Sequence, residues 1–330
     1  MESTTEHQFP NPNIKGLTRS VLVTGGSGYV GSHCCKFLSQ NGFVPVVIDR
    51  NLQNKPVAFG PSFDIDIPTN IQALDSIIKR YNITSCIHFA GSASVAESVR
   101  DPAEYYRNNV IGTIALLDKL IELDIKTFVY SSSAATYGDP GLKLCKEDDW
   151  ANPINAYGSS KLDAEKLIEK YCKEHDFRGV SYRFANCVGP RSNHGVTYDF
   201  VNKLKENPKE LEILGDGKQH KSYFHVDDCI SAMLAKAPGE LCDKGEFVAL
   251  NVGSKDAIDV VTLANEVCKA LKLKGVDYKF TGGVDGGRGW KGDVKKMRLD
   301  IKKLKSHGWD PQYTSRKAIN ETAKWLDENS

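Results

Sequence analysis

Short apolar runs rich in β-branched residues recur along the first 186 positions of the chain, with longer stretches of helical periodicity between them. We expect a buried strand at each run, namely SVLVTG (20–25), FVPVVID (43–49), CIHFAG (86–91), TFVYSSS (127–133) and VSYRFAN (180–186). The periodic stretches at 102–123 and 157–175 predict helices. Strands that are apolar almost throughout and are separated by helices are typical of a parallel sheet covered on both faces. The pattern therefore predicts an α/β fold with a Rossmann-type doubly wound parallel sheet.

The sequence pattern changes after Asn186, where loops rich in glycine, asparagine and aspartate are expected to separate short helices and a few strands. These loops run over 189–195, 214–220 and 281–293. We expect a smaller C-terminal substrate-binding lobe, mainly over 187–330, with some segments returning to the sheet. The Rossmann domain is expected over 18–186, after a flexible N-terminal tail at 1–17.

The composition limits the partners and the location of the protein. The 330 residues include 43 basic and 42 acidic ones, so the chain offers no broad cationic face, and we expect no nucleic-acid partner and no binding to anionic lipid. No apolar run approaches the ~18–20 residues of a membrane span. Nine cysteines without a CxxC spacing favour a reducing compartment, the cytoplasm, and give no metal site.

Three glycines at three-residue spacing, Gly25, Gly28 and Gly31, follow the first expected strand and open a helix in VLVTGGSGYVGSH. At such a turn the bare backbone and the free N–H groups of the helix can approach a pyrophosphate. An ordinary tight turn between a strand and a helix would show the same spacing. The turn predicts a dinucleotide site, whose identity depends on the residues that follow.

The end of the second expected strand supplies a second signal for the cofactor. Asp49 follows the glycines by about twenty residues, where a carboxylate accepts the ribose hydroxyls of NAD and repels the 2′-phosphate of NADP. Arg50 comes next and is the kind of cation that an NADP enzyme uses. We favour NAD, and we expect Asp66 and Ile67 to meet the adenine.

Tyr157 and Lys161 are four residues apart in NPINAYGSSKLDAEK and share one face of a helix. A free phenol has a pKa of about 10, and lowering it to about 7 takes roughly 4 kcal/mol of stabilisation of the phenolate. A lysine ammonium one turn away and a positively charged nicotinamide ring are suitable sources. Ser133, at the carboxyl end of an expected strand, could donate to a substrate oxygen. The structural alternative is a buried tyrosine beside a lysine whose stem packs on apolar surface.

With its other motifs, the sequence resembles the extended short-chain dehydrogenase/reductases, and among them the UDP-glucose 4-epimerases of the NAD-dependent epimerase/dehydratase family. The motifs that carry the resemblance span nearly the whole chain after the tail: VTGGSGYVGSH, HFAGSASVAESV, EYYRNNVIGT, YSSSAATYGDP, NAYGSSK, RFANCVGP, GDGKQHKSYFHVDDC and GRGWKGDVKKM. The resemblance implies a tightly bound NAD that is regenerated in each turnover, with the Rossmann domain holding NAD and the lobe holding a UDP-sugar. It also implies a homodimer formed through the helices at 102–123 and 157–175.

The resemblance also implies roles for individual residues. Tyr157 would take the proton of the sugar 4-hydroxyl, Lys161 would lower the pKa of Tyr157 and bind the nicotinamide ribose, and Ser133 would hydrogen-bond the same sugar oxygen. The other residues implied to bind the cofactor are Gly25, Ser27, Gly28, Tyr29, Val30, Gly31, Asp49, Asn51, Asp66, Ile67, Phe89, Ala90, Gly91, Asn108 and Ser131. Those implied to bind the substrate, besides Ser133, are Asn186, Tyr198, Asp199, Phe200, Lys221, Tyr223, Arg288, Asp293 and Met297.

The implied reaction is epimerisation at C4 of a UDP-hexose, with UDP-glucose and UDP-galactose favoured, by transient oxidation to a 4-keto sugar, rotation and re-reduction. UDP-N-acetylglucosamine and UDP-glucuronate stay open as substrates, because Met297, at the family's gating position, is neither bulky and aromatic nor small. Lys221 stands where many epimerases have arginine, and Ala93 where a lysine is common. Ala134 and Ala135 replace the acidic residues of dehydratases and decarboxylases, which argues against both reactions. A catalytically silent NAD sensor or scaffold is the alternative of another class.

Overall fold

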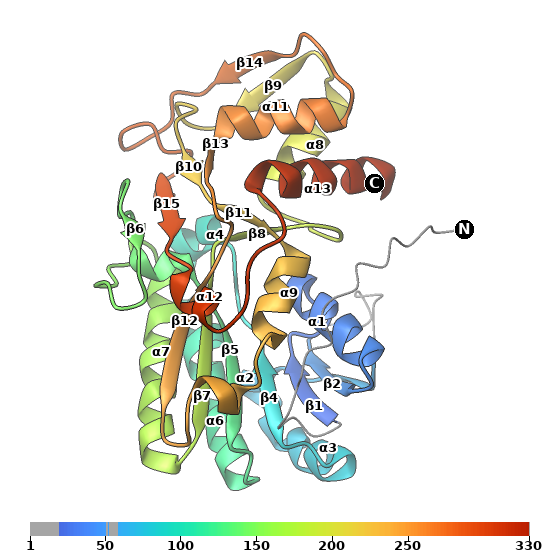
Figure 1. Cartoon of the computed structure of the whole chain (residues 1–330), viewed down its shortest axis with the longest axis vertical. Helices are drawn as coiled ribbons and strands as arrows, with labels where there is room; N and C mark the ends of the chain where they lie inside the picture. The colour runs from blue at the N-terminus through green and yellow to red at the C-terminus, as the bar shows by residue number, and fades with distance from the viewer. Residues whose placement is uncertain (1–19, 51, 53–58, 330) are drawn as a thin grey trace.

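The computed structural model describes residues 20–50, 52 and 59–329. The expected tail at 1–17 and the predicted cofactor residue Asn51 lie outside them. The molecule is elongated, with a large parallel sheet toward one end and a smaller lobe of strands and helices toward the other (Figure 1). The chain passes between the two parts more than once, since a strand from its second half joins the main sheet.

Seven parallel strands form the main sheet in the order β12-β7-β5-β4-β1-β2-β3. Their bounds are β1 Ser20–Thr24, β2 Val44–Asp49, β3 Ser62–Asp64, β4 Ser85–His88, β5 Thr127–Ser133, β7 Arg178–Phe184 and β12 Phe247–Val252. All five strands expected from the sequence are present, and the predicted doubly wound fold is confirmed. The strand order reverses between β1 and β4, and ligands bind at the carboxyl ends of the strands beside such a reversal.

Helices cover both faces of this sheet. Side chains alternate along β1, so that Leu22 faces a core shared with α3, α6 and α7, whereas Val21 and Val23 face a core shared with α1 and α9. The helices are α1 Tyr29–Gln40, α3 Leu74–Tyr81, α6 Gly112–Glu122, α7 Ala156–His175 and α9 Val226–Leu234. Burial on both faces is the reason the strands are almost continuously apolar.

The helix expected at 102–123 is interrupted by a wider turn. Two α-helices, α5 Pro102–Tyr106 and α6, are joined by the π-helical turn η3 Arg107–Ile111. The turn carries Asn108 and Asn109, which are both buried. Such turns are rare and are frequently found at functional sites, so these two asparagines are candidates for a role in binding.

The smaller lobe packs short strands and three helices around a core of its own. Its elements are β8 Asn186–Val188, α8 Val196–Glu206, β9 Glu210–Ile213, β10 His220–Lys221, β11 Tyr223–His225, β13 Ile258–Asp259, α11 Val260–Ala270, β14 Asp277–Phe280, β15 Lys296–Leu299 and α13 Ser315–Asn329. The remaining short elements are α2 Ile67–Asn70, η2 Ile71–Ala73, α4 Val95–Arg100, η4 Ala134–Tyr137, β6 Leu144–Cys145, α10 Pro238–Leu241 and α12 Lys302–Ser306.

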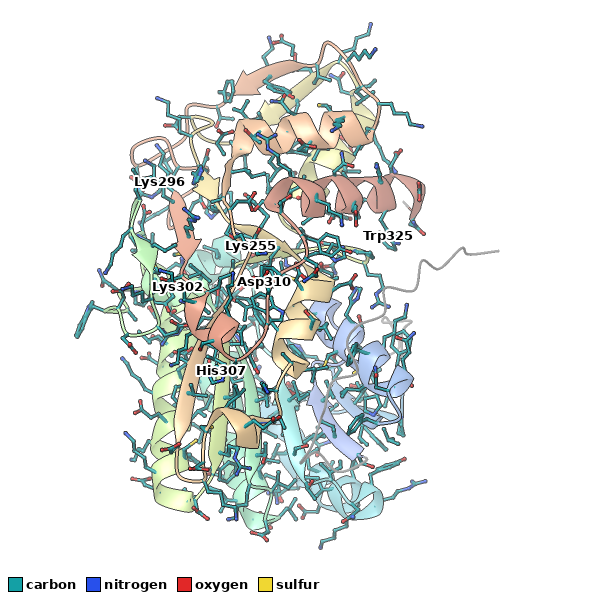
Figure 2. All side chains as sticks on the ribbon, in the orientation of Figure 1. Lys255, Lys296, Lys302, His307, Asp310 and Trp325 are labelled. Atoms are coloured by element: carbon teal, nitrogen blue, oxygen red, sulfur yellow. The ribbon has the colours of Figure 1, made fainter. Side chains whose placement is uncertain are left out.

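The lobe and the sheet domain are interwoven in the chain. Strand β6, from the first half of the chain, pairs with β15 in the four-stranded sheet β13-β10-β15-β6. Conversely, β12 and α9 come from the second half and pack in the sheet domain. On the outside, Lys255 and Asp310 form an ion pair that joins two loops (Figure 2). A domain boundary after Asn186 therefore stays a prediction.

Candidate active site

The turn between β1 and α1 requires glycine at two positions for different reasons. Gly25 has φ +67°, and a Cβ there would lie 2.5 Å from the backbone N of Ala90. A Cβ on Gly31 would lie 2.2 Å from the carbonyl oxygen of Gly25. Helix α1 therefore packs directly on the turn, and its first N–H groups, which have no partner within the helix, are presented beside bare backbone at Gly28.

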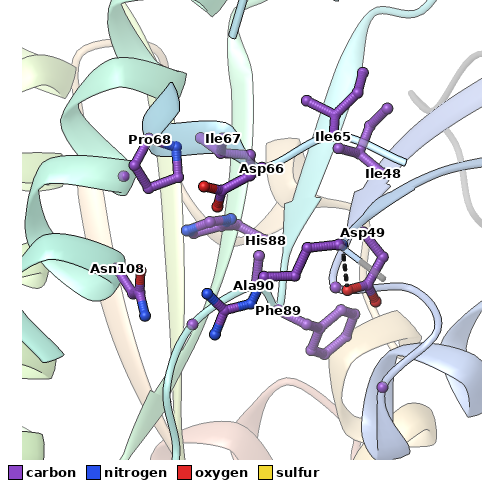
Figure 3. A pocket seen from close by; sticks show the side chains of 15 residues that line it. Ile48, Asp49, Ile65, Asp66, Ile67, Pro68, His88, Phe89, Ala90 and Asn108 are labelled. Atoms are coloured by element: carbon purple, nitrogen blue, oxygen red, sulfur yellow. Dashed lines mark hydrogen bonds between the residues drawn. The ribbon is translucent and has the colours of Figure 1, made fainter. Parts of the chain in front are cut away.

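A cavity of about 210 Å³ opens at the carboxyl ends of the strands beside the glycine turn (Figure 3). Nine of the residues predicted to bind the cofactor line it: Gly25, Gly28, Asp49, Asp66, Ile67, Phe89, Ala90, Gly91 and Asn108. Asp49 and Asn108 lie on opposite sides of it (Figure 3). The cavity is the groove in which a dinucleotide would bind, and we call it the cofactor groove.

Asp49 ends β2 and is almost fully buried. Its carboxylate accepts hydrogen bonds from the backbone N of Ser27 at 3.0 Å and from the backbone N of Arg50 at 2.8 Å. The carboxylate therefore ties the glycine turn to the end of β2. It lies at the position where an acidic residue meets the adenosine ribose in dinucleotide-binding folds.

Asn108 is a buried residue of the opposite wall. Its Nδ2 donates to Ser92 Oγ at 2.9 Å and to Glu104 Oε1 at 3.2 Å, but its Oδ1 is buried with no hydrogen-bond partner. A buried acceptor without a donor costs free energy, so a ligand that donates a hydrogen bond here would be stabilised. The ribose hydroxyls of a dinucleotide are such donors, and the residues present therefore fit NAD.

Tyr29 and Val30 are among the predicted cofactor residues that do not line the groove. The ring of Tyr29 packs edge-on against His33 at 5.8 Å and against His194 at 6.3 Å between ring centroids. The side chain of Val30 packs against the core under α1. The backbone at these positions lies in the first turn of α1, where its N–H groups are available to a phosphate, and binding of the cofactor there stays a prediction.

Ser133, Tyr157 and Lys161 come together from the end of β5 and the first two turns of α7. Helix α7 begins one residue earlier than predicted, because Asn155 caps it and accepts a hydrogen bond from the N of Gly158 at 2.8 Å. Ser133 lies near enough to the Tyr157 phenol to lower its pKa. The structure therefore brings the three predicted catalytic side chains to one place.

Lys161 is buried and fixed. Its Nζ donates to the carbonyl oxygen of Ser131 at 2.8 Å and lies 4.7 Å from the centre of the Tyr130 ring. The hydroxyl of Ser131 in turn donates to the carbonyl oxygen of His88 at 3.0 Å. Burial lowers the pKa of Lys161 to about 8, although the carboxylate of Glu165 acts in the opposite direction.

The pKa of Tyr157 depends on the burial of its phenol and on Ser133. Burial raises the pKa of this phenol above its ordinary value, and the hydrogen bond with Ser133 opposes the increase. The ammonium of Lys161 is directed to the carbonyl oxygen of Ser131. A lowering of this pKa by Lys161 together with a charged nicotinamide ring stays a prediction.

Lys221, Arg288 and Asp293 form one charged cluster on the lobe side. Lys221 Nζ lies 2.8 Å from Asp293 Oδ1, and Arg288 Nε donates to the Asp293 carbonyl oxygen at 3.0 Å. Arg288 also pairs with Asp139, from the loop after β5. Next to this cluster, Asn155 Nδ2 donates to the carbonyl oxygen of the residue before Asp293 at 3.0 Å. The cap of the catalytic helix α7 is thereby joined to the cationic cluster.

The other predicted substrate residues are placed differently. Phe200 is 2% exposed and Tyr223 is 5% exposed, and both side chains belong to the core of the lobe. These side chains support the lobe from inside, and a contact of the two residues with a substrate stays a prediction. Met297 is buried as well, on β15.

Three further substrate candidates keep some accessible surface on the lobe. Asn186 Nδ2 donates to the carbonyl oxygen of Ser222 at 3.0 Å. Tyr198 packs beside the core of the lobe, and Asp199 is paired with Lys203 at 2.9 Å along α8. A contact of these side chains with a substrate stays a prediction.

Several residues around the site were not identified from the sequence. Asn109 accepts from the N of Ser92 at 2.7 Å and donates to Ser160 Oγ at 2.9 Å, which holds the turn after β4 against α7. Neutral His88, whose pKa burial lowers to about 3, bonds Thr24 Oγ1 at 2.6 Å. The cap residue Asn155 could have been identified, since asparagine before a periodic stretch is a helix-start signal. Asn109 and His88 could not have been identified in this way, because their roles depend on contacts between segments that are distant in the sequence.

The described part of the chain contains no group of three or more acidic, histidine or cysteine residues that could hold a metal ion. Among the same residues, no helix is both long and apolar enough to cross a membrane. The site thus consists of an uncharged glycine turn, buried hydroxyls and a small set of fixed cations and carboxylates.

Comparison with known proteins identifies relatives over almost the whole chain. Residues 21–253 match the NAD dependent epimerase/dehydratase family. The UDP-glucose 4-epimerase of Halalkalibacterium halodurans is 33% identical over 334 residues, covering 94% of this chain and 96% of its own. The solved UDP-glucose 4-epimerase of Thermotoga maritima, with UDP-glucose, has a TM-score of 0.81 at 29% identity, covering 94% of this chain and 99% of its own. The solved UDP-glucose 4-epimerase of Thermus thermophilus, in complex with NAD, has a TM-score of 0.82 at 25% identity. The match covers 94% of this chain and 100% of that chain.

Proposed function

The chain belongs to the NAD dependent epimerase/dehydratase family, and from this premise we propose that it is an NAD-dependent isomerase that interconverts UDP-glucose and UDP-galactose at C4. The observation that carries the proposal is that contacts join three parts of the site to one another. These are the cofactor groove, the set of Ser133, Tyr157 and the buried Lys161, and the cluster of Lys221 and Arg288, to which the cap of α7 is joined. Lys221 and Arg288, now paired with Asp293 and Asp139, would be the cations that bind the diphosphate of the sugar.

The residues have separate tasks in this reaction. NAD, when bound, would supply the hydride acceptor for C4 of the sugar and the hydride donor for re-reduction of the 4-keto sugar. Tyr157 takes the proton from the 4-hydroxyl and gives it back in the second half, and such acid–base help is typically worth ~100 to 10,000-fold. Ser133 donates a hydrogen bond to the Tyr157 phenolate, which becomes a neutral phenol when it takes this proton. Lys161 holds the nicotinamide ribose, with its ammonium already fixed by Ser131.

The acidic groups that other reactions of the fold need are missing at the corresponding places. Dehydratases and decarboxylases have carboxylates directly after the Ser133 position, where this chain has the buried Ala134 and Ala135. UDP-N-acetylglucosamine and UDP-glucuronate remain alternative substrates. A silent NAD sensor or scaffold is a weaker candidate, because such a protein has no need for Ser133 beside Tyr157 or for the buried Lys161.

One experiment separates these possibilities. The purified protein is incubated separately with UDP-glucose, UDP-N-acetylglucosamine and UDP-glucuronate, without added NAD, and the products are resolved by chromatography. We expect UDP-galactose from UDP-glucose with no net NADH. The Tyr157→Phe variant should lose turnover by ~100-fold or more while it retains bound NAD. Steady accumulation of NADH on addition of NAD would instead indicate a dehydrogenase, and no conversion of any sugar would support the sensor.

The assembly and the location are part of the same proposal. The helices α5, η3, α6 and α7 expose apolar surface, including Ile111 at 55% and Tyr106 at 38%. We place a homodimer contact there, which light scattering of wild type and Ile111→Asp would test by a change from dimer to monomer mass. We place the protein in the cytoplasm, because all nine cysteines are free and seven of them are buried.

A further inference from the structure

A side chain from one wall of the cofactor groove is paired with a side chain from the other wall. Arg50, which follows β2 and lines the groove, has its Nη2 3.8 Å from Oε1 of Glu104 on α5. Both side chains are nearly half exposed. Glu104 Oε1 is held in turn by Asn108 Nδ2 at 3.2 Å, and Asn108 is buried in the groove wall. The guanidinium thus has a carboxylate partner whose own position is fixed.

The Arg50–Glu104 pair bears on cofactor selectivity, because Arg50 directly follows Asp49. Its backbone N donates to Asp49 at 2.8 Å, so the residue begins directly beside the carboxylate that would meet the adenosine ribose. In dinucleotide-binding folds, an arginine beside this position accommodates the 2′-phosphate of NADP, and its planar fork suits a phosphate. A free Arg50 would therefore weaken the discrimination that Asp49 provides.

We propose that Glu104 is a specificity-determining residue, which holds the guanidinium of Arg50 at the opposite wall and so keeps it from a 2′-phosphate. Asp49 disfavours NADP by repulsion, and Glu104 removes the nearby cation that would otherwise offset this repulsion. The inference rests on the proposed function, since it concerns the NAD of the same site. Glu104 acts through Arg50 and is a positioning residue.

The test measures the ratio of bound cofactors, which does not depend on turnover. Wild type, Glu104→Gln, Arg50→Ala and the double variant are each incubated with NAD⁺ and NADP⁺ at fixed ratios until the bound ratio is constant. Free nucleotide is removed, and the bound dinucleotides are released by denaturation and quantified by mass spectrometry. Glutamine is the suitable replacement, because its amide oxygen still accepts from Asn108 while the charge is lost. Glu169→Gln, which removes an exposed carboxylate paired with Lys173 on α7, is the matched control.

We expect Glu104→Gln to raise the ratio of bound NADP to bound NAD about two- to fivefold. A change of this size corresponds to the loss of one exposed ion pair. The increase should vanish in the Arg50→Ala background, and Glu169→Gln should leave the ratio unchanged. An unchanged ratio in Glu104→Gln would overturn the inference. So would an equal increase with and without Arg50, because Glu104 would then act by direct repulsion alone. Absence of bound dinucleotide in wild type would contradict the proposed function itself.

Discussion

Replacement of Ser133 by alanine should shift the pH dependence of epimerisation to higher pH. The Oγ of Ser133 accepts a hydrogen bond from the backbone N of Ala135 at 3.2 Å, so its single proton is available for the oxygen of Tyr157. That hydrogen bond lowers the pKa of Tyr157, while burial raises it. Without the hydroxyl, burial acts unopposed and the pKa of the phenol increases further.

The size of the effect follows from the strength of a hydrogen bond to a charged group, ~1.5–3 kcal/mol. Since 1.36 kcal/mol corresponds to a factor of ten, the fraction of Tyr157 that is phenolate near neutral pH should decrease by about 10- to 150-fold. The value of kcat/KM should decrease by the same factor there. The difference from wild type should become smaller as the pH approaches the pKa of the phenol, because both proteins then become ionised.

The assay is kcat/KM for UDP-glucose over pH 6–10. Two variants serve as controls for Ser133→Ala. Ser133→Thr retains the hydroxyl and should keep the wild-type profile. Ser132→Ala removes a neighbouring buried hydroxyl that has no hydrogen-bond partner, and it should leave the profile unchanged. A loss of equal size at every pH would refute the reasoning, because Ser133 would then act on the substrate and not on the ionisation of Tyr157.

Three further predictions concern the cofactor turn and the buried charges. Gly31→Ala should remove bound NAD, measured as nucleotide per chain, because its Cβ would lie 2.2 Å from the backbone of Gly25. Glu165→Gln should lower the free energy of unfolding in urea by ~3–5 kcal/mol, because Arg183, at 2.7 Å, would stay buried without its carboxylate. Lys161 has a pKa of about 8 when folded against an ordinary 10.5, so the unfolded state binds more protons between these values and stability should increase with pH there. The increase is on the order of 3 kcal/mol, and urea denaturation at several pH values should show it in wild type but not in Lys161→Met.

The sequence by itself determined the features that depend on local geometry. The alternation of apolar runs and helical stretches indicated the parallel sheet, because the periods of strands and helices are set by the backbone. The glycine turn before α1 and the shared face of Tyr157 and Lys161 are local for the same reason, since each involves residues within one or two turns of the chain. These features are the ones that the structure reproduced as predicted, apart from helix ends that moved by a residue and the π-helical turn.

Only the tertiary structure decided which side chains are buried and which charges meet. Phe200 reads as a binding residue in its motif, yet the core of the lobe encloses it. In the sequence, Arg50 is a cation that would favour binding of NADP. In the folded chain it lies beside Glu104, which is 54 positions away. The shift in the pKa of Tyr157 likewise depends on the burial of its phenol and on Ser133, which belongs to another element. Burial and electrostatic interaction are properties of neighbours in space, and the order of residues along the chain does not contain them until the sheet and the lobe have packed.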